Sequence, residues 1–285
     1  LVVNKKPVVI LQKELEKKYI IARIRKNFYS NLIPIINSKK IIIDIFRNET
    51  LFKSTKKLDY EMIIMAGGKG KRLMPLTKNI PKALVKVNGK PILENIIIKA
   101  RNEGIKNFSL ITFHMYDKIH KYFKNGRKLG VKIKYIREKT PLGTAGGITL
   151  LKPQRSKIFI VSNCDIVTNL NYVDVVNFHK LNKNKVTIAS KFFKLNNPYG
   201  VIRLDNLKNV IKIDEKPSEN NLISAGVYVL NSNILKYFKK NKKIDMTDFI
   251  NYLVLKNLKI GTFPIYENWV DVGNLSDLKS IYNKS

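Results

Sequence analysis

The stretch "MIIMAGGKGKRLMPLT" (Met62–Thr77) joins an apolar run to a cationic loop rich in glycine. The run "MIIMA" predicts a buried β-strand, after which the chain turns. Glycines in that turn can take positive φ and approach a ligand closely, so that successive backbone N–H groups point at phosphate oxygens; they are Gly67, Gly68 and Gly70. The loop fits neither a P-loop nor a dinucleotide fingerprint, which needs a glycine where Leu73 stands. The loop therefore predicts either a phosphate site of another kind or an ordinary turn.

Downstream of this loop, apolar strands alternate with amphipathic helices. The expected strands span residues 62–66, 108–113, 131–136, 157–163, 185–190, 199–205, 210–214, 224–230 and 260–265. The expected helices span residues 91–104, 116–124, 171–182 and 245–257, with a short helix after Gly146 and a last one after Gly273. This order predicts an α/β fold of Rossmann-like type, with a mixed, mostly parallel sheet and helices on both faces. Such sheets bind ligands beyond the carboxyl ends of their strands.

Composition limits the classes of protein to consider. The chain has 285 residues, of which 44% are hydrophobic, enough for one large domain or one domain with a small appendage. It has neither an apolar stretch of about 18 residues nor a secretory signal pattern, so we expect no membrane segment. The single cysteine, Cys164, excludes an internal disulfide and favours a cytoplasmic location.

The formal net charge of +33 raises the question of nucleic-acid binding. The lysines are spread along the whole chain, and no zinc-finger, RRM-like or basic-zipper pattern occurs. We therefore expect no nucleic-acid partner and interpret the charge as a basic surface that attracts small anionic substrates.

The first 58 residues form a separate unit of predicted order β-α-β-β-α, with two strands around an Asn-Ser-Lys-Lys turn at residues 37–40. Such a unit is too small to bury much core alone. The charged segment Lys53–Glu61 is expected to be a linker, which places the second domain at residues 62–285. Because the sequence begins at Leu1 and not at a methionine, we expect the natural N-terminus to lie upstream.

The extended motif "AGGKGKRLMPLTKNIPKALVKVNGKPILE" (residues 66–94) resembles the nucleotidyltransferases that make nucleoside-diphosphate sugars. Their signature is a Gly-Gly-x-Gly-x-Arg-Leu loop, then Pro-Leu-Thr, Pro-Lys and a helix that starts with Gly-Lys-Pro. The resemblance covers about residues 62–283 in several separate motifs. Residues 1–58 resemble one cystathionine-β-synthase-type (CBS) repeat through "LIPIINSKKIIIDIF", although the glycine expected before the last strand is absent and Ile43 lies nearby.

The resemblance implies attack by a sugar-1-phosphate oxygen on the α-phosphorus of a nucleoside triphosphate, with release of pyrophosphate. The nucleophile is already an anion, so the site needs cations and a divalent metal more than a general base. In the family's motifs, Asp165 and Asp271 hold Mg²⁺, Arg72 grips the triphosphate, and Lys82 reaches the α-phosphate. Taken alone, Asp165 also suits a turn or helix cap, and Trp269 and Gly273 around Asp271 suit a core aromatic residue and a turn. Cys164 stands where the family's Asn-Gly-Asp motif has glycine.

Two further groups of residues follow from the resemblance. The nucleotide-binding group is Ala66, Gly67, Gly68, Gly70, Arg72, Lys82, Glu138, Gly143 and Thr144. Glu138 and Thr144 offer polar groups to the base or ribose, and Thr144 alternatively caps a helix. The sugar-phosphate group is Gly200, Glu215, Lys216, Ser224 and Gly226, in which Glu215 accepts from sugar hydroxyls and Lys216 pairs with the phosphate. Ser224 stands where many relatives have asparagine.

The sequence disfavours zinc and cysteine chemistry. The histidines His114, His120 and His179 lack the spacing of a zinc site, and nothing places a histidine base beside Cys164. A non-catalytic protein that binds a sugar nucleotide and senses a second nucleotide through residues 1–58 is the main rival, although both metal acids are present. We predict an Mg²⁺-dependent cytoplasmic enzyme that uses a nucleoside triphosphate and a sugar-1-phosphate. The combination of a CBS-type repeat with "LGTAG" (residues 142–146) and "NWVDVG" (residues 268–273) resembles the branch that makes GDP-activated sugars for surface glycans, including aminosugar and heptose derivatives. This resemblance favours GTP over dTTP or UTP, and self-association into a homo-oligomer stays open.

Overall fold

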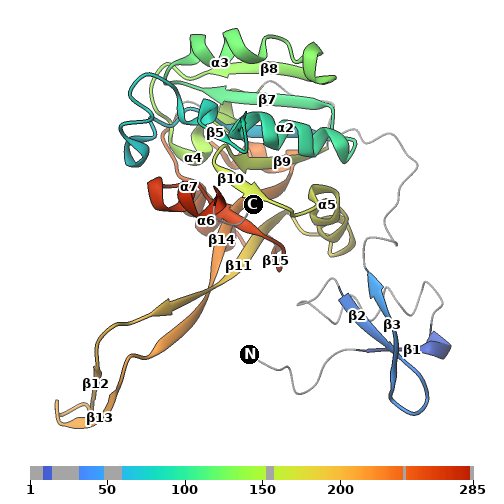
Figure 1. The fold of residues 1–285 in the computed structure, drawn as a ribbon, viewed down its shortest axis with the longest axis vertical. Coiled ribbons are helices and arrows are strands. Elements are labelled where there is room, and N and C mark those ends of the chain that lie inside the picture. Colours follow the sequence, from blue (N-terminus) through green and yellow to red (C-terminus); the bar gives the residue numbers. More distant parts are fainter. Residues whose placement is uncertain (1–8, 15–31, 48–59, 152–156, 240–241, 283–285) are drawn as a thin grey trace.

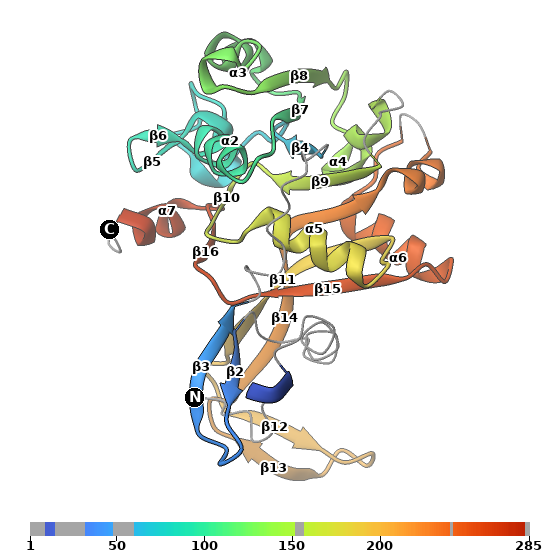
Figure 2. The same cartoon turned by 90° about the vertical axis from the view of Figure 1, so that its right-hand side faces the viewer.

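A computed structural model describes residues 9–14, 32–47, 60–151, 157–239 and 242–282. The main body is built on a seven-stranded sheet (Figures 1 and 2). In spatial order its strands are β15 (Ile260–Ile265), β11 (Val186–Asn196), β14 (Ser218–Asn231), β9 (Ile158–Asn163), β4 (Glu61–Met65), β7 (Asn107–Thr112) and β8 (Lys132–Arg137). Strand β14 runs antiparallel to both of its neighbours, and the other neighbouring pairs are parallel. The predicted mixed, mostly parallel sheet is confirmed.

Apolar residues on both faces of the sheet build two cores. Along β4, Met62 and Ile64 point into one core and Ile63 into the other, as the alternation of a strand requires. The first core includes buried residues of α2 (Ile92–Asn102), α3 (Tyr116–Phe123) and α5 (Tyr172–Leu181). The second includes residues of α4 (Gly143–Gly146), the 3-10 helix η6 (Gly147–Leu150) and α6 (Met246–Leu255). Helices thus cover both faces, as predicted.

The remaining elements are short. Helix α7 (Leu275–Tyr282) ends the described chain, and 3-10 helices occur at η1 (Gln12–Glu14), η3 (Lys71–Leu73), η4 (Lys82–Leu84), η5 (Arg127–Leu129) and η7 (Ser232–Tyr237). Two-stranded sheets pair β5 (Lys86–Val87) with β6 (Lys90–Pro91), and β10 (Ile166–Thr168) with β16 (Trp269–Asp271). The sequence did not predict β10 and β16, because three-residue strands carry no readable periodicity.

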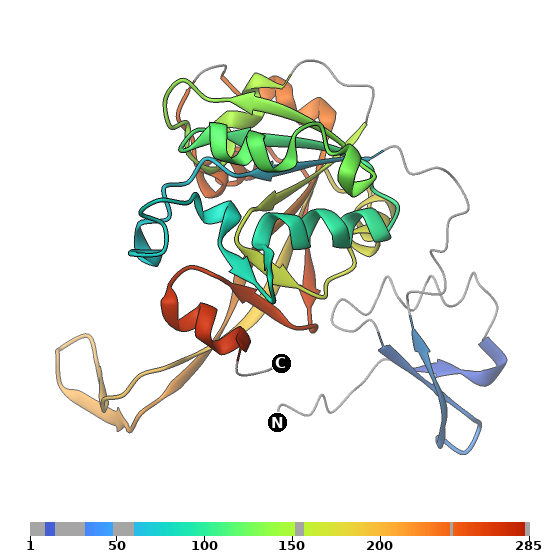
Figure 3. The same ribbon diagram turned by 45° about the horizontal axis from the view of Figure 1, so that its top comes forward.

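A long arm extends from the sheet. Strands β11 and β14 stay paired as far as Asn196 and Ser218, well beyond the ends expected from the sequence. Their tip carries the antiparallel hairpin of β12 (Val201–Leu204) and β13 (Val210–Asp214). Figures 1 and 3 show this arm projecting away from the main body.

The described N-terminal residues form a sheet of their own. It contains β1 (Ile10–Leu11), β2 (Leu32–Ile36) and β3 (Ile42–Arg47), with β1 parallel to β2 and β3 antiparallel to it. The side chain of Asn37 accepts hydrogen bonds from the N–H groups of Lys39 and Ile41, both at 3.0 Å, and so forms the predicted turn. The two helices expected in this unit lie outside the described residues.

The linker is shorter than predicted at its C-terminal end. Tyr60 is buried, and Glu61 opens β4 and accepts a 2.5 Å hydrogen bond from the Ser109 hydroxyl. Residues 53–59 lie outside the described ranges. Among the described helices, none has the length and apolar character that a membrane crossing requires.

Candidate active site

The glycine-rich loop after β4 depends on Gly70 for its shape. Gly70 has a φ of 63°, and a Cβ added there would lie 3.0 Å from Thr77 Cγ2 and 3.1 Å from Lys82 Cβ. The Thr77 hydroxyl donates a 2.8 Å hydrogen bond to the Gly70 carbonyl. The loop therefore lies directly against Lys82, and any side chain at position 70 meets both a backbone penalty and a collision.

The two predicted metal-binding aspartates lie side by side. In the β10–β16 ladder Ile166 is the partner of Asp271, and the Val272 N–H donates a 2.9 Å hydrogen bond to the Asp165 carbonyl. Both carboxylates line one cleft of about 450 Å³. Residues 106 positions apart in the chain therefore reach one site through a pairing of two short strands.

Lys82 neutralises one of these carboxylates. Its Nζ atom lies 2.5 Å from Asp165 Oδ2, and the two side chains are only 9% and 17% exposed. Low exposure strengthens such a pair and makes the loss of one partner costly. Lys82 directly follows the buried Pro81, and this Pro-Lys dipeptide places the Lys82 ammonium group beneath the glycine loop.

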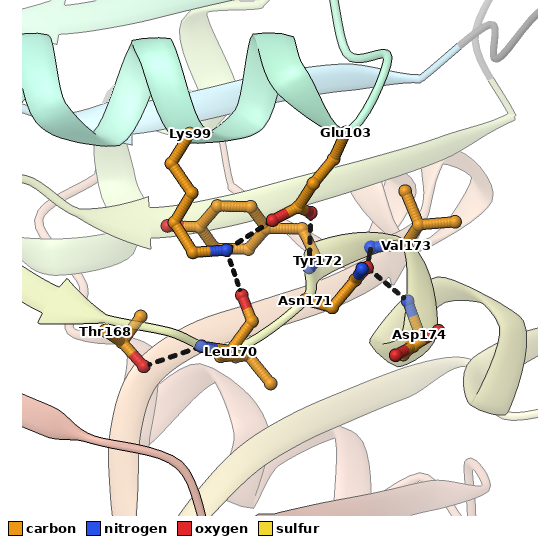
Figure 4. Close-up of polar contacts among 8 residues, drawn as sticks. All are labelled: Lys99, Glu103, Thr168, Leu170, Asn171, Tyr172, Val173 and Asp174. Atoms are coloured by element: carbon orange, nitrogen blue, oxygen red, sulfur yellow. Dashed lines mark hydrogen bonds and ion pairs between the residues drawn. The ribbon is translucent and has the colours of Figure 1, made fainter. Parts of the chain in front are cut away.

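Strand β10 is held in place by helix α2 (Figure 4). Lys99 donates hydrogen bonds to Glu103 and to the Leu170 carbonyl, and the other Glu103 oxygen accepts from the Tyr172 N–H at 2.7 Å. The Asn171 side chain caps α5 by accepting hydrogen bonds from the N–H groups of Val173 and Asp174. This network fixes the chain segment that follows Asp165 and β10. It also supplies hydrogen-bond partners for the half-buried side chains of Lys99 and Glu103.

The cleft collects most of the predicted catalytic and nucleotide-binding residues. Its lining includes Gly67, Gly68, Gly70, Arg72, Lys82, Glu138, Gly143, Thr144, Asp165 and Asp271. Ala66 is not among them, because it is buried in the core and donates a 2.7 Å hydrogen bond to the Ile111 carbonyl. The cleft lies past the carboxyl ends of β4 and β9, where a sheet of this class binds its ligand.

Arg72 reaches the same end of the cleft as Asp271. A Cβ added at Gly273 would lie 3.3 Å from Arg72 Nη1, so the guanidinium packs directly over the backbone at Gly273. Burial and then repulsion from Asp165 raise the pKa of Asp271, while Lys82 and Arg72 act in the opposite direction. The site is thus a pair of acids flanked by two fixed cations.

Glu138 is a buried carboxyl group in the wall of this cleft. It follows β8, and its Oε1 atom is buried without a hydrogen-bond partner among the described residues. Its oxygens lie against two glycines: an added Cβ would come within 3.1 Å of Oε2 at Gly67 and 2.7 Å of Oε1 at Gly147. Burial raises the pKa of Glu138 to about 7. A polar atom left unpaired at this depth is suited to a ligand that supplies N–H donors.

Thr144 does not cap its own helix, which was the alternative role predicted for it. It lies inside α4, whose N-cap is Leu142 and receives no side-chain hydrogen bond. The Thr144 hydroxyl instead accepts a 2.8 Å hydrogen bond from the Met246 N–H, and Asp245 Oδ1 accepts from the Thr144 N–H at 2.8 Å. Gly143 permits this contact, because its φ is 81° and an added Cβ would lie 2.6 Å from the Ile244 carbonyl oxygen. The partner, Asp245, lies about 100 residues away and could not be predicted.

The predicted sugar-phosphate residues divide into two sets. Gly226 lies beside the site, since its φ is 72° and an added Cβ would be 2.9 Å from Asn163 Nδ2. Ser224 is hydrogen-bonded to Tyr228 at 2.8 Å. Gly200, Glu215 and Lys216 are on the arm, where all three are exposed and none lines the cleft. The structure does not bring these three to the aspartates.

Cys164 is a structural residue. Burial is the main cause that raises the pKa of its thiol to about 12, with a smaller contribution from Asp165. The residue does not adopt the left-handed backbone that would need the glycine of the family motif.

Among the histidines, His179 is buried and hydrogen-bonded to Thr187 and Asn231, and the ring of His120 packs on Tyr135.

The cleft residues fit a divalent cation. One oxygen of each aspartate, Asp165 Oδ1 and Asp271 Oδ1, is buried without a hydrogen-bond partner among the described residues. In those same parts of the chain, no group of three or more His, Cys, Asp or Glu side chains could hold a metal. Two carboxylates suit Mg²⁺, which keeps several of its waters and needs few protein ligands.

Some residues of the cleft were not singled out from the sequence. They are Met65, Ile111, Pro141 and Asn163. Asn163 carries a signal that was available, because it is the first residue of the Asn-x-Asp motif that ends in Asp165. The other three are apolar and differ in no visible way from core residues.

Comparison with known proteins gives consistent results. The family model described as nucleotidyl transferase matches residues 61–285. The chain is 33% identical over 217 residues to D-glycero-alpha-D-manno-heptose 1-phosphate guanylyltransferase of Campylobacter jejuni, which covers 75% of this chain and 94% of that protein. It is 34% identical over 227 residues to the bifunctional protein GlmU of Methanococcus aeolicus, covering 76% of this chain and 52% of that protein.

The chain therefore spans about half the length of the bifunctional relative and nearly all of the guanylyltransferase. Among solved structures, HddC from Yersinia pseudotuberculosis superposes with a TM-score of 0.62 at 25% identity, over 79% of this chain and 99% of that chain.

Proposed function

Because the chain belongs to the nucleotidyl transferase family, we propose that it catalyses the reaction of a nucleoside triphosphate with a sugar-1-phosphate to give a nucleoside-diphosphate sugar and pyrophosphate. The observation that carries this proposal is that Asp165 and Asp271 line one cleft together, each with an unpartnered oxygen, beside a cationic glycine loop. The relative from Campylobacter jejuni is a heptose 1-phosphate guanylyltransferase, which supports the same assignment.

The chain's own residues address the main barrier, which is repulsion between two polyanions. Backbone N–H groups of the glycine loop and the Arg72 guanidinium hold the triphosphate, and Arg72 stabilises charge on the departing pyrophosphate. Lys82 exchanges its pairing with Asp165 for contact with the α-phosphate. The sugar phosphate needs no general base, since its attacking oxygen is already ionised.

Mg²⁺, held by Asp165 and Asp271, would supply charge neutralisation at the phosphates. The unpartnered oxygens Asp165 Oδ1 and Asp271 Oδ1 would in turn gain a partner. The cleft is lined by three cations, Lys71, Arg72 and Lys82, and three carboxyl groups, Glu138, Asp165 and Asp271, so the protein offers a balanced set of charges around the reacting phosphates.

We further propose guanine as the base. Glu138 presents an unpartnered buried carboxyl oxygen, and the Watson–Crick edge of guanine offers two adjacent donors, N1–H and N2–H₂. Uracil and thymine offer one N–H between two carbonyl oxygens, which a carboxylate repels. A site that must satisfy a buried polar group discriminates strongly against an analogue that leaves it unpaired. The guanylyltransferase relative supports this choice, and surface-glycan precursors are the product class we propose.

Residues 1–58 are proposed to be a CBS-type unit that precedes the catalytic domain, and the reaction is proposed to run in the cytoplasm. This proposal rests on the resemblance of residues 32–46 to such a repeat, and the β1–β2–β3 sheet with its Asn37 turn is compatible with it. A regulatory role of this unit can be tested by adding nucleotides that are not substrates to the activity assay and measuring whether turnover changes.

The direct test is a pyrophosphate-release assay across a grid of GTP, UTP, dTTP and ATP against several sugar-1-phosphates, with Mg²⁺. We expect turnover only when both substrates are present, and the highest kcat/KM with GTP. Binding of a sugar nucleotide without turnover in any pairing would favour a non-catalytic sensor. Turnover with UTP or dTTP above that with GTP would overturn the role proposed for Glu138.

A further inference from the structure

The arm, defined here as residues 192–222, concentrates exposed apolar side chains. Eleven of the 22 large hydrophobic residues that are exposed in the described chain belong to it, with exposures from 47% to 82%. Half of the exposed large apolar residues therefore fall in about a tenth of the sequence. Exposed apolar side chains gathered on one element in this way mark a candidate interaction site.

The hairpin at the tip has one apolar face and one charged face. Ile202 stands opposite Ile213 and Leu204 opposite Val210, with a bulge that leaves Ile211 unpaired beside them. These five residues are 52% to 65% exposed. On the other face Asp214 forms ion pairs with Arg203 at 3.1 Å and with Lys212 at 2.9 Å. An isolated two-stranded hairpin is marginal in water, so an uncovered apolar face requires a partner surface.

The charge of the arm indicates what that partner is. The arm holds five of the chain's 54 Lys and Arg residues and four of its 21 Asp and Glu residues, a net +1, which leaves +32 of the +33 to the rest. Two copies of so basic a protein repel one another wherever their main bodies meet. The arm is where they can approach without net repulsion, whereas an acidic partner would be drawn to the rest of the surface.

The available area is sufficient for a stable contact between two copies. A free large apolar side chain exposes on the order of 150–200 Å², so the five residues of the hairpin face, at 52% to 65% exposure, supply roughly 500 Å² on each copy. Two copies would together bury roughly 1,000 Å², which is the size that a specific interface needs to reach.

We propose that the chain forms a homodimer in which the apolar hairpin faces, Ile202, Leu204, Val210, Ile211 and Ile213 of each copy, pack against one another across a two-fold axis. Glu215 and Lys216 follow directly on this face, so the dimer also fixes the part of the arm that carries them. The dimer does not depend on the proposed activity.

The test measures the mass of the whole chain by sedimentation and light scattering at about 10 μM, a concentration that populates a dimer of micromolar affinity. We expect about twice the 32.9 kDa of one chain. The double variant Ile202→Glu/Ile213→Glu should raise the dissociation constant by about 100-fold or more, because it buries unpaired charges at the contact. The matched control Leu255→Glu changes a residue that is 80% exposed on α6, outside the arm, and should remain dimeric. A monomeric wild type, or a double variant that still dimerises, would overturn the proposal.

A second variant covers the case in which the double variant fails to fold. Ile213→Cys adds one exposed thiol to a chain whose single native cysteine is buried. Mild oxidation should give a covalent dimer from Ile213→Cys and none from Leu255→Cys. If Ile213→Cys stays monomeric and resists alkylation, another segment of the same chain covers the face. If it stays monomeric and reacts freely, the face is bare. Both results contradict the dimer.

Discussion

Replacing Glu138 with glutamine should remove a pH-dependent loss of stability. Burial raises the pKa of Glu138 to about 7 from an ordinary value of 4.5. Below pH 4.5 the folded and unfolded chains both hold the proton, and the group contributes nothing. Between 4.5 and 7 the unfolded chain releases the proton while the folded chain keeps it, so stability falls as pH rises. Above 7 the full penalty applies.

The shift corresponds to at most about 3 kcal/mol. We expect about 2 kcal/mol, because the carboxyl group opens onto the cleft and is partly screened there. Urea unfolding of wild type and Glu138→Gln at half-unit steps from pH 5 to 9 measures it. The free energies of unfolding should differ least at pH 5, move apart between pH 5 and 7, and stay apart by a constant amount above pH 7, with the variant the more stable. Glu219→Gln, at an exposed position on the arm, should follow the wild type. Parallel curves for wild type and Glu138→Gln across the range would refute the reasoning.

Three further substitutions test the cleft and the arm. Lys82→Met leaves Asp165 nearly buried and unpaired, so the free energy of unfolding should fall by about 3 kcal/mol and turnover should fall by about 100-fold or more. The control Lys78→Met, at an exposed position, should change neither, and equal effects of the two substitutions would contradict the pairing. Gly70→Ala places a Cβ at a φ of 63° and against Lys82, so it should cost about 1–2 kcal/mol of stability and raise the KM for the nucleotide; an unchanged KM would separate the loop from binding. Lys216 was predicted from its motif to bind the sugar phosphate, but it lies exposed on the arm outside the cleft, so Lys216→Ala should leave the KM for both substrates unchanged, like Lys194→Ala on the same arm; a several-fold rise in the KM for the sugar phosphate alone would restore the motif-based role.

The sequence predicted the elements that extend over several residues. Strand β4, helix α2 and the later strands and helices show clear periodicity, and their positions are confirmed. Asp165 and Asp271 could be named because they lie in motifs, but their adjacency depends on β10 and β16, whose pairing is tertiary. The sequence also could not give the length of the arm, since "FFKLN" (residues 192–196) mixes apolar and polar residues and extends β11 only through its pairing with β14.

The sequence also did not predict the surroundings of the individual site residues. The raised pKa of Glu138 results from burial beside Gly67 and Gly147. Gly147 lies in the same stretch as Glu138, "REKTPLGTAGG" (residues 137–147), but nothing in the sequence indicates that it packs against Glu138. Thr144 makes its hydrogen bonds to a loop about 100 residues away. In both cases the residue was found from a motif, and its physical role came from contacts that no local pattern encodes.

The central claim is that Asp165 and Asp271 act together at one reaction centre. The most direct measurement is pyrophosphate release by wild type, Asp165→Asn and Asp271→Asn with GTP, a sugar-1-phosphate and Mg²⁺, alongside thermal unfolding of each protein. We predict that each substitution lowers kcat by about 1,000-fold while the protein stays folded, and that the double variant is no worse than either single variant. Near-normal turnover in a folded Asp165→Asn or Asp271→Asn protein would contradict the account.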